Sequence, residues 1–430
     1  MSSIKLKDSG IAWIGKIPQH WEVGKVKHYY KMHVGFTPTS SNSLYYDEEN
    51  GHTWITISDM KSKVVSESSS KISALYIQEK NPKIVPKNSL LYSFKLSVGV
   101  VAFNEKEVYT NEAIASFLDG ENVNLSFLYY SSRLIAFNAN ENIYGAKLLN
   151  QELIKNAKIV FPPLHEQEAI AKFLDEKCQD IDALIATHQE SIEKLRDYRT
   201  SLISETITQG LDKNATLKDS GIAWIGKIPQ HWEVKKLKFV ATLNPIFKHK
   251  NQLRESDEVS FLPMECLRTN KINPYIASLG KVSDYTFFQE NDILMAKVTP
   301  CFENLNIAKA TNLRNGIGFG TSEIYILRCF DIFDDFLLFF IQSDGFVQKA
   351  TSEMRGANGL KRIPSEFVSD CKIPLPPLHE QEAIAKFLDE KCQDIDALIA
   401  THQESIEKLR GYRTSLISEV IVGQHQGAYQ

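Results

Sequence analysis

The sequence lacks the segments that membrane-spanning, secreted and zinc-ribbon proteins need. It has no apolar run of the roughly 18 residues that cross a bilayer. The first residues, MSSIKLKDSG, lack the apolar stretch of a secretory signal. None of the six cysteines belongs to a C-x-x-C pair, so a zinc ribbon is not expected. These absences predict a cytoplasmic protein that does not associate with membranes.

Catalytic motifs are missing or incomplete. The chain has no P-loop of the form GxxxxGK[ST], and no clear strand–loop–helix unit with a following acidic residue surrounds the glycine-rich stretch Gly316–Gly320. The Asn/Asp-Pro-Pro-aromatic motif of adenine methyltransferases occurs only in truncated form, at Asn244-Pro245-Ile246-Phe247 and Asn273-Pro274-Tyr275. His165 and His379 have no neighbouring ligands that would favour a metal site. We therefore expect no catalysis and no bound metal.

The chain also has little excess charge of either sign, and the charge is unevenly distributed along the sequence. The net charge is −4. Residues 24–160 carry 15 Lys/Arg against 13 Asp/Glu, and residues 235–374 carry 18 against 16, a surplus of +2 each. Residues 164–209 and 378–430 have charges of −5 and −4. Two mildly basic domains alternate with two acidic segments, a pattern compatible with DNA binding through local basic surfaces or with two near-neutral domains.

Two blocks of sequence are repeated almost without change. Residues 6–23, LKDSGIAWIGKIPQHWEV, recur identically as residues 217–234. Residues 162–205 recur as residues 376–419, and 44 positions contain one difference, Asp197 against Gly411. An internal repeat of this kind determines the architecture of the whole chain.

The segments between the constant blocks, residues 24–161 and 235–375, share little visible identity. The repeating unit is therefore a constant box, a variable domain and a constant helix. We interpret the constant parts as a framework and the variable parts as the source of specificity. A duplication followed by drift of one copy is the alternative, although drift would also scatter changes through the framework.

The constant block after Pro162-Pro163 has no Pro or Gly before Gly210, which predicts a helix of about 40 residues, near 60 Å long. Its apolar residues recur at the three- and four-residue steps of a coiled-coil seam. We expect it to pair with its second copy, although two helices packed on separate domains remain the alternative. The predicted seam consists of Leu174, Ile181, Ile185, Ile192, Leu195 and Leu202, with Leu388, Ile395, Ile399, Ile406, Leu409 and Leu416 in the second copy. The exit segment Thr206–Ala215 is where we expect length to vary without breaking this seam.

The variable domains contain short β-branched and apolar runs bounded by turn residues, which predicts mixed α/β structure. The expected strands are His52–Ile57, Ser89–Ser93, Val98–Phe103, Val259–Leu262, Asp292–Ala296 and Glu323–Leu327, and the expected short helices are Phe127–Phe137 and Phe333–Phe346. The predicted fold class is α+β, with two mixed α/β domains separated by two long helices that form an antiparallel coiled coil in a pseudo-two-fold tandem repeat.

The order WIGKIPQHWEV, then Gly35-Phe36-Thr37-Pro38, then IVFPPLHEQEAIAKFLDEKCQDIDALI resembles the specificity subunits of Type I restriction–modification systems. The second copy of the repeat contains the corresponding stretch IPLPPLHEQEAIAKFLDEK. The resemblance implies four segments. A first target recognition domain spans residues 1–161 with its box at 6–23, and a long helix with linker spans 162–216. A second recognition domain spans 217–375 with its box at 217–234, and the second helix and tail span 376–430.

The resemblance further implies that each recognition domain reads one half of a bipartite, asymmetric target in double-stranded DNA, and that the helix pair sets the gap between the half-sites. The subunit would dock two methyltransferase subunits that use S-adenosylmethionine, and motor-nuclease subunits that use ATP and magnesium. The chain itself would hold no cofactor. A coiled-coil scaffold and a degenerate DNA-modifying enzyme are the alternative functions.

DNA contacts need cations and small polar donors on exposed loops. Lys297, Thr299 and Asn304 correspond in position to Lys95 and Ser97. The stretch with Lys361 and Arg362 corresponds to that with Lys147. For any single residue, a solvated surface side chain is the alternative. The candidates are Thr37, Thr39, Ser40, Ser41, Lys95, Ser97, Tyr144 and Lys147 in the first domain, and Lys248, Lys250, Lys297, Thr299, Asn304, Asn358, Lys361 and Arg362 in the second.

Overall fold

A computed structural model of the chain describes residues 5–95, 97–141, 147–247, 254–357 and 359–428. Internal contacts divide the chain into two units. Unit 1 comprises residues 1–187 and 405–430, and unit 2 comprises residues 188–404. Each unit therefore contains one variable domain together with a part of both constant helices.

The two constant blocks form the long helices α6, Leu164–Gln209, and α11, Leu378–Ile421. Helix α6 begins directly after Pro162-Pro163 and ends before Gly210, which has a positive φ of 77°. A side chain at position 210 would place Cβ 3.0 Å from the indole of Trp232. Glycine therefore ends α6 because it accepts this backbone conformation and because a Cβ would be crowded against the tryptophan.

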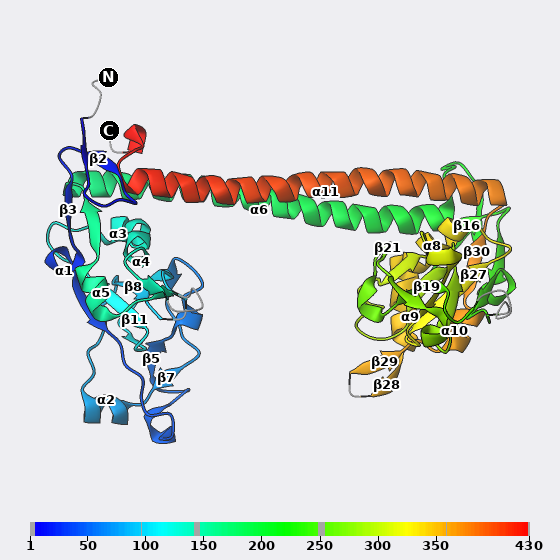
Figure 1. The fold of residues 1–430 in the computed structure, drawn as a ribbon, viewed down its shortest axis with the longest axis horizontal. Helices are drawn as coiled ribbons and strands as arrows, with labels where there is room; N and C mark the ends of the chain where they lie inside the picture. The colour runs from blue at the N-terminus through cyan, green and yellow to red at the C-terminus, as the bar shows by residue number, and fades with distance from the viewer. Residues whose placement is uncertain (1–4, 96, 142–146, 248–253, 358, 429–430) are drawn as a thin grey trace. The chain divides into compact units, whose positions relative to one another are not determined.

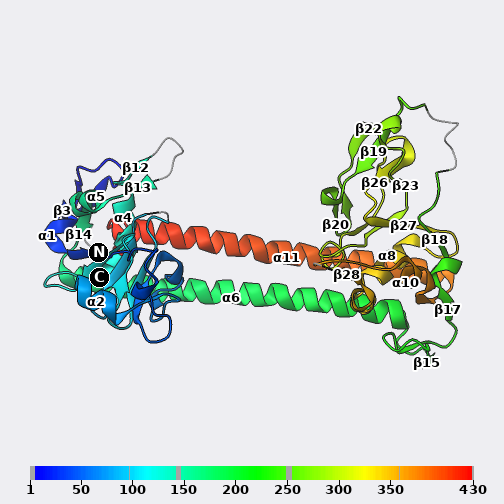
Figure 2. The ribbon, with the colours of Figure 1, turned by 90° about the horizontal axis from the view of Figure 1, so that it is seen from below.

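Within unit 1, the start of α6 packs antiparallel against the end of α11. The ring of Phe173 lies 5.3 Å from that of His425, between ring centroids, and Asp182 forms a 3.0 Å ion pair with Arg413. As the residue numbers rise along α6, those of the partner residues fall, which defines the antiparallel direction. Figure 2 shows both helices along this stretch.

Within unit 2, the remaining part of α6 packs in the same antiparallel sense against the start of α11. His188 and His402 approach each other to 2.8 Å between their Nδ1 atoms, and Arg199 lies 3.4 Å from Asp396. His188 and Arg199 are polar residues that interrupt the apolar seam in the sequence, and both find partners on the opposite helix. The antiparallel helix pair expected from the sequence is thus confirmed in each unit.

The apolar seam of these helices is largely shielded from solvent. Leu174, Ile181, Ile192, Leu388, Ile395, Ile406 and Leu416 are buried, and Ile185, Leu195, Leu202, Ile399 and Leu409 are half-buried. Leu184 and its repeat copy Leu398 point outward, with exposed fractions of 51% and 50%. At the end of α6, Ile207 is fully buried in the core of unit 2, so the first part of the exit segment belongs to the packed helix.

The centre of unit 1 is a five-stranded sheet in the order β4-β11-β8-β9-β6. Strand β8 is buried on both faces, because Leu90 and Tyr92 point into one apolar core and Leu91 into another. A second sheet has the order β10-β5-β7. The strands of both sheets are β4 Lys31–Val34, β5 His52–Ile55, β6 Val64–Val65, β7 Lys71–Ile72, β8 Leu90–Ser93, β9 Val101–Asn104, β10 Tyr109–Thr110 and β11 Ile114–Leu118.

The constant parts of unit 1 pair around this domain. The box forms the hairpin β1 Leu6–Asp8 and β2 Lys16–Pro18, and β3 Glu22–Lys25 pairs with β14 Lys158–Phe161, the strand that leads into α6. The remaining elements are β12 Asn140–Glu141, β13 Lys147–Leu148, α1 Val26–Tyr29, α2 Ala74–Lys80, α3 Leu125–Ser131, α4 Arg133–Ala136, α5 Gln151–Asn156, η1 Ser43–Tyr45, η2 Ile57–Asp59 and η6 Gln426–Ala428.

Unit 2 contains two four-stranded sheets, in the orders β18-β27-β24-β25 and β22-β19-β26-β23. Figure 2 shows the second sheet beside the first. The strands of these sheets are β18 Ala241–Leu243, β19 Glu258–Leu262, β22 Tyr275–Ser278, β23 Thr286–Gln289, β24 Ile293–Ala296, β25 Ile307–Lys309, β26 Ile317–Gly320 and β27 Ile324–Cys329.

The constant parts of unit 2 repeat the arrangement in unit 1. The second box forms a hairpin, and the strand after it pairs with the strand that leads into α11. These strands are β15 Leu217–Asp219 with β16 Lys227–Pro229, and β17 Glu233–Lys236 with β30 Lys372–Leu375. The other elements are β20 Leu267–Arg268, β21 Lys271–Ile272, β28 Arg355–Ala357, β29 Leu360–Arg362, α7 Leu279–Val282, α8 Asp334–Gln342, α9 Asp344–Glu353, α10 Ser365–Asp370, η3 Leu237–Phe239, η4 Met264–Cys266 and η5 Arg314–Gly316.

The main sheets of the two units correspond strand by strand. Strands β4, β11, β8 and β9 of unit 1 take the order that β18, β27, β24 and β25 take in unit 2, all antiparallel. The mixed α/β class predicted from the sequence is confirmed. Each of the six expected strands is present within a few residues, and each expected short helix is split in two, at Ser132 and at Ser343.

Candidate nucleic-acid interface

A hydrogen-bonded anchor joins the constant box to the constant helix in both units. In unit 1, Glu166 accepts bonds from Trp21 Nε1 at 2.8 Å and His20 Nε2 at 2.6 Å. In unit 2, Glu380 bonds to Trp232 Nε1 at 3.0 Å and His231 Nε2 at 2.7 Å. Both indoles are fully buried. From sequence alone these glutamates look like acidic first-turn residues of the helix; the structure adds a more specific role, as acceptors for the box.

A glutamine in the next position joins the constant helix to the variable domain. Gln167 donates to the carbonyl of Pro162 at 2.9 Å and accepts from the backbone N–H of Asn124, also at 2.9 Å. Gln381 makes the same pair of bonds, to the carbonyl of Pro376 and from the N–H of Phe333, both at 2.8 Å. Sequence reasoning missed this clamp, although its signal is the glutamine repeated inside Pro-Pro-Leu-x-x-Gln.

Hydrogen bonds hold the polar loop of unit 1 at its base and within its length. Trp54 Nε1 donates to the carbonyl of Phe36 at 3.0 Å, and the hydroxyl of Tyr46 donates to the carbonyl of Pro38 at 2.9 Å. A side chain at position 35 would put Cβ 2.0 Å from the carbonyl oxygen of Thr110, so only glycine fits there. The candidate residues Thr37, Thr39, Ser40 and Ser41 lie along this loop, and all four are exposed.

The turn between β8 and β9 carries the candidates Lys95 and Ser97, and both are exposed. Two bonds across the turn stabilise it. The hydroxyl of Ser93 donates to the carbonyl of Ser97, and the N–H of Gly99 donates to the carbonyl of Ser93. The turn therefore presents a lysine and a serine on a short, supported loop.

In unit 2, four candidates that are far apart in sequence lie together. Thr299 exchanges backbone and side-chain hydrogen bonds with Lys361 at 3.0 Å. Strand β29, which carries Lys361, also carries Arg362, and the carbonyl of Lys297 accepts from Ile363 at 2.9 Å. This basic cluster, defined as Lys297, Thr299, Lys361 and Arg362, joins the end of β24 to the β28–β29 hairpin.

Two residues that sequence reasoning missed hold the basic cluster in place. Glu323 forms a two-pronged ion pair with Arg362, at 2.8 and 3.0 Å, which holds the pKa of the Glu323 carboxyl below its usual range. The ammonium of Lys297 lies over the ring of Tyr325, 5.1 Å from its centroid. Glu323 directly precedes β27, the strand next to β24, and Tyr325 lies near the start of that strand.

The β28–β29 hairpin is exposed along both strands. In Figure 1 it extends away from the rest of unit 2. Arg355 on β28 pairs in register with Arg362 on β29, which places two guanidinium-bearing residues opposite each other. A two-stranded ribbon with basic side chains has dimensions that suit the major groove of DNA.

The correspondence predicted between the units holds in part. Lys147 and Lys361 each stand two residues before a buried apolar residue, Leu149 or Ile363, that precedes a short helix. The match of Lys297 to Lys95, however, is displaced by one residue. Lys297 N donates to the carbonyl of the residue before β27, as Phe94 N does to the residue before β11.

The remaining candidates lie apart or outside the described residues. Asn304 is exposed in a turn whose backbone carbonyl accepts from Thr269 at 3.4 Å, and it does not join the basic cluster. Tyr144, Lys248, Lys250 and Asn358 lie outside the residues that the structure describes, and only the backbone of Lys147 is described.

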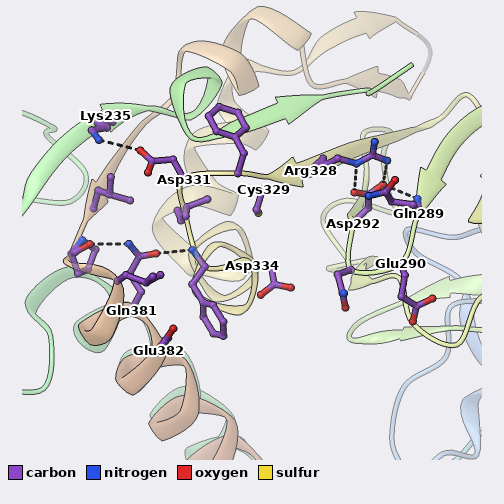
Figure 3. A pocket seen from close by; sticks show the side chains of 17 residues that line it. Lys235, Gln289, Glu290, Asp292, Arg328, Cys329, Asp331, Asp334, Gln381 and Glu382 are labelled. Carbon is purple, nitrogen blue, oxygen red and sulfur yellow. Dashed lines mark hydrogen bonds and ion pairs between the residues drawn. The ribbon is translucent and has the colours of Figure 1, made fainter. Parts of the chain in front are cut away.

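A pocket of about 640 Å³ in unit 2 has the opposite electrostatic character (Figure 3). It is lined by five carboxylates, namely Glu290, Asp292, Asp331, Asp334 and Glu382, against two cations, Lys235 and Arg328. Asp292 and Arg328 form a two-pronged pair at 2.8 and 2.7 Å. Burial, with the nearby carboxylates of Asp334 and Asp292, raises the pKa of Cys329 to about 12. The pocket would repel phosphate, so we assign it no DNA contact.

Metal sites and membrane spans are both absent from the part of the chain that the structure describes. Among the described residues, no group of three or more His, Cys, Asp and Glu side chains is arranged to hold a metal ion. The same part of the chain contains no helix long and apolar enough to cross a membrane.

Sequence comparison finds relatives of one kind. The chain is 35% identical over 201 residues to the Type I restriction enzyme EcoAI specificity subunit of Escherichia coli, a match that covers 44% of this chain and 34% of that subunit. It is 24% identical over 433 residues to the Type I restriction enzyme MjaVIII specificity subunit of Methanocaldococcus jannaschii, which covers 95% and 94%. The chain thus matches only about a third of the length of the first relative.

Solved structures share the fold over nearly the whole chain. A chain from a study of complex assembly and conformational transition of the type I R-M system aligns with a TM-score of 0.69 and 14% identity, covering 95% of this chain and 99% of that one. The HsdS subunit from Thermoanaerobacter tengcongensis aligns with a TM-score of 0.56 and 15% identity, covering 95% and 98%.

The family comparison matches both copies of the repeat. The Type I restriction modification DNA specificity domain matches residues 18–195 and again residues 229–409. Each match runs from the constant box through a variable domain into a long helix, so it includes the glutamate anchor and the glutamine clamp. The chain therefore belongs to the family of Type I restriction–modification DNA specificity proteins, and it carries the family's domain twice.

Proposed function

We propose that the chain is a non-catalytic specificity subunit that reads a bipartite, asymmetric target in double-stranded DNA. One observation carries this proposal. The anchors between box, helix and variable domain are the same in both units, whereas the exposed polar residues that the two variable domains present are different. A repeated framework with two different reading surfaces suits a DNA site with two different halves.

The chemistry of these surfaces supports DNA as the ligand. In unit 2 the basic cluster and the β28–β29 ribbon offer lysine and arginine side chains, which bond to phosphates and to the major-groove edge of guanine. In unit 1 the candidate donors are the neutral threonine and serine hydroxyls between Thr37 and Ser41, together with the ammonium group of Lys95. The first half-site would therefore depend on different contacts from the second.

The partners follow from the same proposal. Two methyltransferase subunits would bind the chain, and motor-nuclease subunits would join them. S-adenosylmethionine, ATP and magnesium would belong to those subunits, and this chain would hold none of them. The helix pair and the constant box are the natural docking surfaces, because only constant surfaces can serve partners that do not change with the DNA target.

Mapping of methylated DNA tests the proposal. The chain is co-expressed with its methyltransferase, and the modified adenines are located by sequencing. In a second strain, residues 24–161 are replaced by the variable domain of a relative. We expect a bipartite motif in the first strain, and a motif with one changed half in the second. A motif in one block, or a change in both halves, would contradict the proposal.

A further inference from the structure

Three arginines line a cavity of about 280 Å³ in unit 1. Arg133 comes from the variable domain, at the start of α4, and Arg410 and Arg413 come from the constant helix α11. Tyr129 and the turn residue Gly99 complete part of the wall. The cavity thus lies where the variable domain meets the constant helix, beside the β8–β9 turn that carries Lys95 and Ser97.

Carboxylates of the protein balance two of the three positive charges in this cavity. Arg413 is paired with Asp182 at 3.0 Å, and Arg410 with Glu407 at 2.6 Å. Arg133 is half-buried, and among the described residues its guanidinium forms no ion pair with a carboxylate. Burial, together with the charge of Arg413, lowers the pKa of Arg133. A guanidinium that is partly removed from water without a counter-ion is costly, and an anion bound beside it would remove that cost.

We propose that this cavity is a phosphate-binding site. Guanidinium groups approach from two different elements, which suits a tetrahedral ion with several acceptor oxygens better than a carboxylate with two. The phosphate is either free or part of a DNA backbone, since both present the same oxygens. The position beside the β8–β9 turn favours the DNA backbone. The site goes beyond the proposed function, because a contact to phosphate does not itself read the base sequence.

The second unit lacks the site, although its helix is the same. Asn124 and Phe333 occupy equivalent places, because each donates its N–H to the repeated glutamine. Counting nine residues on from each, Arg133 corresponds to Gln342, which donates to Asn270 at 2.6 Å. The copies of Arg410 and Arg413 are Arg196 and Arg199, so only the variable arginine is missing. We therefore expect one phosphate site in each chain.

The repeat supplies matched variants for a test by calorimetric titration of the full chain with inorganic phosphate. We expect one site in the wild type. Arg133→Gln, which gives unit 1 the residue of unit 2, should weaken binding by about tenfold or more, and so should Arg410→Gln. Arg196→Gln, the same change in the repeat copy of this helix segment, which differs only in having Asp197 where the second copy has Gly411, should have no effect. Since Arg410 is 56% exposed, its replacement is not expected to disturb folding.

Binding of a DNA duplex at several salt concentrations identifies the source of the phosphate. If it belongs to DNA, Arg410→Gln lowers the salt dependence by about one phosphate contact and Arg196→Gln does not. If it is free, both variants bind DNA like the wild type and only phosphate binding changes. Acetate should bind more weakly than phosphate. The site is refuted if phosphate does not bind at about 10 mM, a concentration well above a weak Kd of about 1 mM. Equal effects of Arg410→Gln and Arg196→Gln would also refute it, and so would tighter binding of acetate than of phosphate.

Discussion

The indole of Trp21 donates its N–H to Glu166 at 2.8 Å, across 145 positions of sequence, and so ties the constant box to the first turn of α6. Because the indole is fully buried, loss of the acceptor removes a charged hydrogen bond from the interior. We predict that Glu166→Ala lowers the free energy of unfolding of unit 1 by about 1–3 kcal/mol. Denaturant unfolding followed by tryptophan fluorescence measures the change.

Glu168 provides the control, because it lies in the same turn of α6 and is exposed. Glu168→Ala should leave the free energy of unfolding within about 0.5 kcal/mol of the wild type. Equal stability of Glu166→Ala and the wild type would show that the box does not depend on this bond.

The basic cluster yields a prediction about DNA. Replacing Lys361 and Arg362 by glutamine removes two cations from the β28–β29 ribbon. We expect weaker DNA binding and a salt dependence reduced by about 0.9 for each phosphate that the variant no longer neutralises. Methylation should lose selectivity in one half-site only. Lys281→Gln, an exposed lysine elsewhere in unit 2, should change neither property. If selectivity falls in both half-sites, the cluster does not belong to one reading surface.

The pairing of the long helices can be tested by placing carboxylates either in the buried seam or on the exposed outer face. Ile192 is buried and Ile185 half-buried, so the double change Ile185→Asp and Ile192→Asp puts carboxylates into the seam. We predict a loss of several kcal/mol, seen as lower thermal stability and failure to assemble with partner subunits. Leu184→Asp with Leu398→Asp makes the same chemical change at exposed positions. That variant should remain folded, and comparable damage from both pairs would contradict the seam.

A length change in the exit segment distinguishes its two parts. Helix α6 continues to Gln209 with Ile207 buried, whereas residues 211–214 are exposed loop. Four residues inserted after Leu211 should be absorbed by this loop at small cost, because closure entropy rises slowly with loop length. The methylated motif should therefore keep its gap. A gap widened by one or two base pairs, roughly the length of four helical residues, would instead show that the exit segment helps to set the distance between the half-sites.

The helices could be predicted from the sequence because their apolar residues recur periodically over a long stretch. The alignment of residues between neighbouring strands could not be predicted in the same way. Pro162-Pro163 and Gly210 bound a run without helix breakers, and the helix has those bounds. By contrast, Lys297 and Lys95 differ by one position in their sheets, because register depends on hydrogen bonds between strands that no short motif encodes. The Glu323–Arg362 pair joins residues 39 positions apart, and it was likewise not predictable because it depends on how the strands are aligned.

The clamps of Gln167 and Gln381 have a consequence for the history of such proteins. Each glutamine reaches its variable domain through a main-chain N–H, of an asparagine in one unit and of a phenylalanine in the other. The amide of the peptide bond is common to all residues except proline, so this hydrogen bond sets almost no side-chain requirement on the variable domain. The bond can therefore form again when recombination between the constant blocks brings in a foreign variable domain, and this part of the frame need not evolve anew with each domain.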